Sequence, residues 1–179
     1  PLLPAYSTGL VTRDCILLEF SSTILCLLLA GKVGSNMASE IGTMRIKEKI
    51  DALEIMGVNS AAYLILPKII ATVLFFPLLS LFSMMVGMLG GYLIAVFTGV
   101  VLTSAYLEGL HYCFVPFYIT YSLVKMAVFA FIITSISAFY GYYAAGNSLE
   151  VGRASTRAVV TSSITIMIFN LILTQLMLT

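Results

Sequence analysis

Four long apolar stretches constrain the fold of this 179-residue chain more than any other feature. They cover about residues 16–33, 69–96, 115–140 and 159–178. Each is close to the roughly 20 residues that a helix needs to cross the hydrocarbon core of a bilayer. Charged residues make up only 9% of the chain, too few to cover the surface of a soluble domain. The sequence therefore predicts an all-α integral membrane protein, a bundle of transmembrane helices.

The charges between these stretches predict how the helices are oriented. Residues 32–60 and 141–157 contain most of the Lys and Arg, whereas residues 98–114 contain Glu108 and no Lys or Arg. With four spans, the two basic segments fall on the same side, which the positive-inside rule makes cytoplasmic. Residues 98–114 and both ends of the chain are then expected outside.

Two prolines mark the second apolar stretch. Pro67 precedes it by two residues and suits the first turn of a helix, where the missing N–H of proline is not needed. Pro77 lies inside the stretch, where proline interrupts backbone hydrogen bonding and bends a helix. We expect the second span to begin near Pro67 and to kink near Pro77.

Small residues recur every four positions where the first stretch ends and again inside the second. They are Ala30, Gly34, Ala38 and Gly42, with Gly87 and Gly91 as the second set. This spacing puts small residues on one helix face and lets another membrane helix approach closely. Two interpretations remain open, helix packing within one chain and contact between two chains.

Residues 43–56 predict one short, charged helix on the cytoplasmic side, with Gly57 as its stop signal. Apolar residues fall on two sides of it, and Lys47 with Asp51 forms an i,i+4 ion pair. About 14 residues with this much charge cannot span a bilayer. Such a helix either lies on the lipid headgroups or binds in a groove of a protein partner. Apolar residues on two sides favour binding to a protein partner.

The run AGKVGSNMASEIGTMRIKEKIDALEIMGVNSAAYLILPKIIA, residues 30–71, resembles the signature region of the MlaE family. The family consists of permease subunits of ABC systems that move phospholipids across the Gram-negative envelope. Lys32 and Lys68 stand where the family usually has Arg, and Ser60 stands where Pro is usual. The resemblance covers essentially the whole chain. The matching residues include Gly31, Gly34, Ser35, Glu40, Gly42, Met44, Glu48, Asp51, Ala52, Leu53, Met56, Pro67, Gly90, Gly91, Lys125 and residues 155–160.

The resemblance implies an architecture. Residues 1–179 would form a single permease domain that is incomplete at its N-terminus, because relatives have five spans preceded by a membrane-lying helix. Two copies would form a homodimer in the bacterial inner membrane, with a phospholipid in a cavity at their interface. An MCE-domain protein would sit on the periplasmic side. A STAS-domain protein often binds the ATPase of such systems.

Residues 43–56 would then be the coupling helix that docks on a cytoplasmic ABC ATPase. The chain itself is expected to be a transporter subunit and not an enzyme, with ATP and Mg²⁺ bound by the partner. Gly31 and Lys32 are followed by Val33, and the glycine spacing of a Walker A motif is missing. The coupling candidates are Glu40, Met44, Arg45, Ile46, Glu48, Ile50, Asp51, Leu53 and Glu54.

Three polar residues inside the spans are candidates for the lipid cavity: Glu19, Lys125 and Asn170. Charges at such depth are costly, which makes them functional candidates by default. The resemblance matches Glu19 to the Glu of an Arg-Glu pair that faces the cavity, although Leu18 stands in place of the Arg. It matches Lys125 to a family lysine. Ion pairing and hydrogen bonding between helices are the alternative roles.

No catalytic or metal-binding pattern accompanies these residues. Cys15, Cys26 and Cys113 match no metal or disulfide spacing and are interpreted as packing residues, and His111 stands alone. Nucleic acid is not expected as a partner, because no run of Lys and Arg is present. The alternative functions are a channel, which needs more than Glu108 for a ring of charge, and an intramembrane enzyme, which needs a nucleophile or metal set.

Two arginines, Arg153 and Arg157, precede the last apolar stretch. Topology and contact with anionic lipid explain them, and contact with the ATPase is the alternative.

Overall fold

A computed structural model describes residues 6–99 and 102–178, and within these residues the structure is helical and contains no strand. Four helices are long and apolar enough to cross a membrane: Ser7–Ile46, Ser60–Thr98, Phe117–Tyr142 and Ser148–Met177. The prediction of an all-α membrane protein is confirmed. Each predicted span overlaps one of these helices. The third helix begins at Phe117, two residues after the predicted start, and the other three begin before their apolar stretches.

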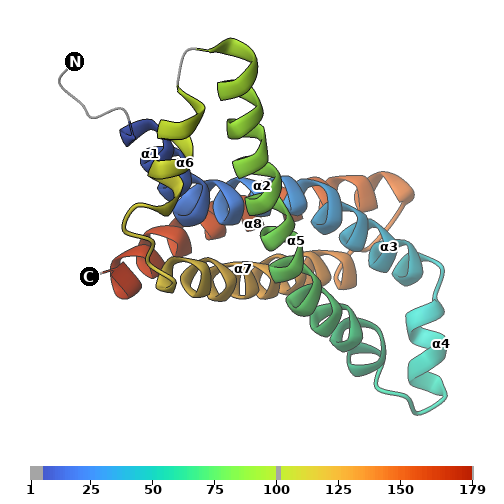
Figure 1. Cartoon of the computed structure of the whole chain (residues 1–179). Helices are drawn as coiled ribbons and strands as arrows, with labels where there is room; N and C mark the ends of the chain where they lie inside the picture. The colour runs from blue at the N-terminus through green and yellow to red at the C-terminus, as the bar shows by residue number, and fades with distance from the viewer. Residues whose placement is uncertain (1–5, 100–101, 179) are drawn as a thin grey trace.

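The first long helix, Ser7–Ile46, is continuous but changes its hydrogen-bonding pattern along its length (Figure 1). It consists of α1 (Ser7–Cys15), the π-helix η1 (Ile16–Ile24), α2 (Leu25–Leu29), the π-helix η2 (Ala30–Gly34) and α3 (Ser35–Ile46). Forty residues at 1.5 Å each extend about 60 Å, roughly twice the thickness of the hydrocarbon core. α3 therefore continues well beyond the apolar stretch.

The segment 43–56 is not one helix, contrary to the prediction. α3 ends at Ile46, Glu48 adopts a left-handed backbone with φ of 56°, and α4 spans only Lys49–Ile55. This turn folds α4 back so that Ile50 is fully buried, and that burial offsets the strain of the left-handed residue. The ion pair of Asp51 also differs from the prediction, since its partner is Arg45, at 2.6 Å, and not Lys47.

Helix α5 (Ser60–Thr98) begins seven residues before Pro67, so Pro67 is not in its first turn as expected. The side chain of Asn59 caps the helix by accepting a hydrogen bond from the backbone N–H of Ala62 at 3.2 Å. Pro67 and Pro77 both lie inside the helix, and Figure 1 shows that α5 bends along its length.

The remaining helices are α6 (Thr103–His111), α7 (Phe117–Tyr142) and α8 (Ser148–Leu178). α7 is the most buried of the four long helices and packs against α5, α8 and the first helix. The main core forms along it, where Met126, Phe129 and Ile133 pack with Cys26 and Ile166. Cys26 is therefore a packing residue as predicted, whereas Cys15 and Cys113 are exposed.

The small-residue stripe packs within the chain. Ala30 and Ala38 are fully buried, and a Cβ on Gly34 would lie 2.9 Å from the Ser137 hydroxyl of α7. A Cβ on Gly42 would lie 3.1 Å from the Val151 side chain of α8. The second set behaves likewise, since Gly87 faces Ile16 and Gly91 touches the Tyr106 hydroxyl. Of the two interpretations, this structure supports packing within one chain.

Candidate functional site

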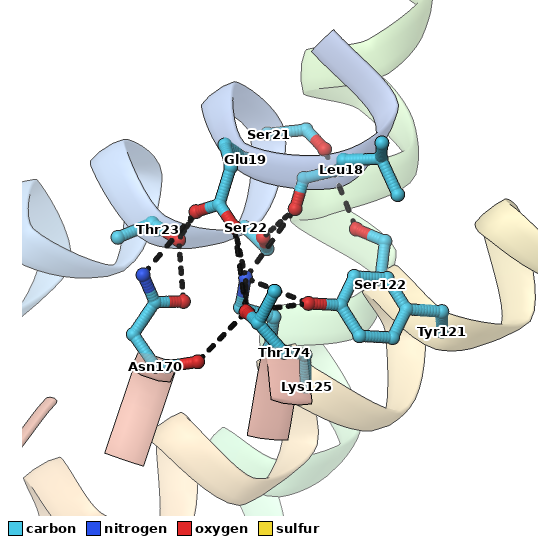
Figure 2. Close-up of polar contacts among 10 residues, drawn as sticks. All are labelled: Leu18, Glu19, Ser21, Ser22, Thr23, Tyr121, Ser122, Lys125, Asn170 and Thr174. Carbon is cyan, nitrogen blue, oxygen red and sulfur yellow. Dashed lines mark hydrogen bonds and ion pairs between the residues drawn. The ribbon is translucent and has the colours of Figure 1, made fainter. Parts of the chain in front are cut away.

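The three predicted cavity candidates meet in one polar cluster where α7 crosses the first helix and α8 (Figure 2). Lys125 of α7 is fully buried, and its Nζ donates to Oε1 of Glu19 at 2.9 Å. Burying a lysine among apolar helices is costly unless a counter-charge and further acceptors surround it. The geometry supplies both.

Lys125 has three further acceptors, which lie on all three helices. Its ammonium donates to the Leu18 carbonyl at 3.3 Å, the Tyr121 hydroxyl at 3.1 Å and the Thr174 hydroxyl at 3.5 Å. Its Nζ also lies 5.1 Å from the centre of the Tyr121 ring. An ammonium has only three N–H donors, so this environment satisfies it completely.

Glu19 is the part of the cluster that reaches the surface. Its Oε2 accepts hydrogen bonds from Thr23 at 2.7 Å and from the Asn170 amide at 3.3 Å. The side chain of Glu19 is nevertheless 45% exposed, whereas that of Lys125 is fully buried. A polar group arriving at the subunit surface would therefore meet the carboxylate first and the ammonium behind it.

Three members of the cluster were not anticipated from the sequence: Thr23, Tyr121 and Thr174. Each lies four residues from a predicted member on the same helix, as in Glu19 with Thr23 and Tyr121 with Lys125. Residues four apart share one helix face, so the i,i+4 spacing of polar residues inside a span was the available signal.

A second buried charge, Arg13 of α1, was also missed. Its guanidinium is almost fully buried, forms an ion pair with Asp14 at 2.9 Å, and donates to the carbonyls of Leu110 and Tyr112 at 3.1 and 2.7 Å. These carbonyls lie at the C-terminal end of α6, where a positive charge is favourable. Arg13 thus fastens α6 to the first helix and has a structural role.

The coupling candidates are mostly engaged within the chain. Glu40 pairs with Lys68 of α5 at 2.6 Å, and Arg45 pairs with Asp51. Glu54 accepts hydrogen bonds from Ser60 and Tyr142, each at 2.9 Å, and these bonds lower the pKa of its carboxyl below the ordinary value. These contacts link α4 to α5 and α7.

The apolar candidates divide into buried and accessible residues. Ile50 is fully buried, so we revise its expected role from contacting a partner to anchoring α4. Met44, Ile46 and Leu53 are half-buried. The accessible apolar residues lie just beyond them, where the side chains of Ile55 and Met56 are 87% and 68% exposed.

No group of three or more His, Cys, Asp and Glu that could hold a metal ion occurs among residues 6–99 and 102–178. His111 lies on the exposed surface of α6. The geometry is that of a polar cluster within an apolar helix bundle, with a separate apolar tip formed by Ile55 and Met56.

Comparison with known sequences finds consistent relatives. A sequence model of the family described as Permease MlaE matches residues 3–176. A probable ABC transporter permease protein of Rickettsia bellii is 42% identical over 158 residues, which cover 88% of this chain and 61% of that protein. A protein of the same description from Synechocystis is 35% identical over 159 residues, covering 89% of this chain and 60% of its own length.

A more distant relative is the Arabidopsis thaliana protein named TRIGALACTOSYLDIACYLGLYCEROL 1, chloroplastic. It is 33% identical over 157 residues, which cover 88% of this chain and 45% of that protein. The chain thus spans less than two thirds of the length of these relatives.

The four apolar helices define a multi-pass membrane protein, and two of these relatives are described as probable ABC transporter permease proteins. The match to the family model extends over nearly the entire chain. The chain belongs to the MlaE permease family.

Proposed function

We propose that this chain is the membrane subunit of an ATP-driven transporter of phospholipids. The observation that carries the proposal is the half-exposed Glu19, paired with a fully buried Lys125, on a surface that is otherwise apolar. Apolar walls with a few polar groups that fix orientation suit a ligand with acyl chains and a charged head. The Arabidopsis relative is named after a diacylglycerol lipid, which supports a lipid substrate.

A second copy of the chain would complete the lipid cavity. Beside Glu19, the side chains of Phe20 and Ile24 are exposed on the first helix. A partner subunit covering this face would enclose an apolar space with Glu19 at its edge. We assign the lipid site to such a homodimer interface in the bacterial inner membrane.

A separate cytoplasmic ATPase would supply the energy and hold ATP with Mg²⁺, as expected for relatives described as ABC transporter permeases. The apolar tip, Ile55 and Met56, belongs to a charged segment and suits a groove on a protein. We place the ATPase there. An MCE-domain protein would bind the opposite side of the membrane, and a STAS-domain protein would bind the ATPase.

The coupling route follows from the contacts of α4. Its buried Ile50 and the Glu54–Tyr142 hydrogen bond fix α4 to the end of α7, and α7 carries Lys125. Displacement of the tip by the ATPase would move α4 and α7 together, because packed helices transmit strain. The ion pair with Glu19 would then shift relative to the bound lipid.

The test uses the full-length chain with its ATPase and extracytoplasmic partner, reconstituted in proteoliposomes containing a fluorescent phospholipid. Replacing Ile55 and Met56 by serine should reduce ATP-driven lipid movement about tenfold or more, because exposed apolar anchors dominate protein contacts. The control is Leu149→Ser, which changes an apolar residue at the same end of the bundle whose 66% exposure is close to the 68% of Met56.

Normal lipid movement in the tip variant would overturn the coupling assignment. Ion conductance without ATP, in place of lipid movement, would overturn the transporter itself and favour a channel.

A further inference from the structure

A second cavity lies far from the polar cluster, between the C-terminal end of α7 and the start of α8. Its volume is about 340 Å³. The residues used below are Phe139, Tyr140, Tyr143, Glu150, Ala154 and Arg157, all of which line it. Three aromatic rings and one guanidinium thus face the same space.

Contacts between helices place this cavity at the end of the apolar spans. Arg157 is the last charged residue before residues 158–178, which contain none. The hydroxyl groups of Tyr140 and Thr161 are 3.1 Å apart, which puts the end of α7 level with the first turn after Arg157. Tyrosine and arginine at such a boundary are typical of the membrane–water interface.

The charge at the mouth of the cavity is positive. Glu150 is paired with Arg153 at 2.8 Å, so its carboxylate is compensated. Arg157 is exposed and takes part in none of the ion pairs found among the described residues. An unpaired guanidinium beside aromatic walls is suited to a phosphate group, to which it can donate two parallel hydrogen bonds.

We infer that this cavity binds the headgroup of an anionic phospholipid from the adjoining leaflet, with its phosphate on Arg157. Basic pockets between transmembrane helices on the cytoplasmic side bind such headgroups. The acyl chains would follow the exposed faces of Phe139 and Tyr143, which are 58% and 70% exposed. The bound lipid would brace the α7–α8 hairpin. This site is distinct from that of the transported lipid, because it lies toward the opposite end of α7 from Lys125.

The test compares the full-length protein in nanodiscs of phosphatidylcholine alone and of phosphatidylcholine mixed with phosphatidylglycerol. Phosphatidylglycerol should raise the thermal unfolding midpoint and should be retained in native mass spectra. Arg157→Gln should weaken phosphatidylglycerol binding about fivefold, the contribution typical of one basic residue at an anionic surface.

Lys32→Gln is the matched control, since it removes the same charge from an exposed residue that does not line the cavity. Lys32 also lies at a similar depth, because the Ser155 hydroxyl donates to the Ser35 carbonyl at 2.9 Å and so aligns the two helices. Lys32→Gln should retain nearly all phosphatidylglycerol binding.

A second variant, Ala154→Phe, fills the cavity while preserving every charge. It should also lose retained phosphatidylglycerol, with an unchanged unfolding midpoint in phosphatidylcholine. Equal losses in the Arg157 and Lys32 variants, or full retention by Ala154→Phe, would show only general attraction to an anionic surface and would overturn the site. Normal lipid binding with weakened ATPase association in Arg157→Gln would make Arg157 a protein contact, which also overturns it.

Discussion

Replacing either partner of the Glu19–Lys125 ion pair should destabilise the protein, but by different amounts. In Glu19→Gln the ammonium of Lys125 stays fully buried without a counter-charge. In Lys125→Met the remaining carboxylate lies at the subunit surface, 45% exposed, and keeps the hydrogen bonds from Thr23 and Asn170. Removing one partner of a buried pair costs about 3–5 kcal/mol, whereas exposed pairs contribute about 0–1 kcal/mol. We expect a loss of about 3 kcal/mol for Glu19→Gln and about 1–2 kcal/mol for Lys125→Met.

The double variant separates the ion pair from the packing around it. Glu19→Gln combined with Lys125→Met leaves no uncompensated charge, so it should be more stable than Glu19→Gln alone. The control is Thr72→Val, which changes no charge and removes the 2.7 Å hydrogen bond to Thr134 between α5 and α7. Interhelical hydrogen bonds in membranes contribute about 0.6 kcal/mol, so this variant should change stability much less.

Stability would be measured by titration with sodium dodecyl sulfate in mild detergent. The chain has ten tyrosines and no tryptophan, so the near-ultraviolet circular dichroism of the tyrosines reports tertiary packing. The reasoning fails if Lys125→Met is the more damaging single change. It also fails if the double variant loses the full sum of the two single losses, because the charges would then be uncoupled.

Three further predictions concern packing, the α6 contact and pH. Gly141→Ala should cost about 1–3 kcal/mol in the same titration, because its Cβ would lie 2.8 Å from the Ala38 carbonyl oxygen. Gly31→Ala, which has open space around it, should be neutral or slightly stabilising. Arg13→Met should speed amide hydrogen exchange in α6, because the carbonyls of Leu110 and Tyr112 lose their donor. Unchanged exchange would refute the structural role of Arg13. The hydrogen bonds from Ser60 and Tyr142 lower the pKa of Glu54, so the ionised carboxylate stabilises the fold at pH values above its ordinary pKa of 4.5. This stabilisation should fade as the pH falls below 4.5 and the carboxylate is protonated. Glu54→Gln should show less of this acid sensitivity, and an identical pH profile would refute the effect.

The existence of the four spans followed from the sequence, but the ends of the helices did not. α5 begins at Ser60, well before the apolar stretch, because the side chain of Asn59 caps it there. The first helix continues to Ile46 because Gly34 and Gly42 let it pack closely on α7 and α8. Hydropathy reports contact with lipid, and these extensions depend on contact with other helices.

The break at Glu48 was also beyond the reach of sequence patterns. Residues 43–56 consist of good helix formers, and only glycine commonly marks a left-handed turn. The turn forms because it allows Ile50 to join Met37 and Ile41 in the core. Such a tertiary gain cannot be read from local propensity.

The candidate site was predictable residue by residue but not as a cluster. Glu19, Lys125 and Asn170 each stand out as polar residues within an apolar stretch. Whether they meet depends on how each helix is rotated, and the hydrophobic pattern of α7, which carries Lys125, is nearly uniform around the helix. The i,i+4 polar pairs were the remaining clue, because they mark the face that turns inward.

The arrangement along α7 connects the polar cluster to the coupling candidates. Lys125 and Tyr142 are 17 residues apart on this helix, a separation of about 26 Å. One end holds Glu19 of the first helix, and the other holds Glu54 beside the exposed tip. Because α7 is the most buried of the four long helices, it can shift only together with its neighbours. In the proposed transporter, a push on the tip would therefore reach the ion pair by movement of α7 as a rigid body, without local unfolding.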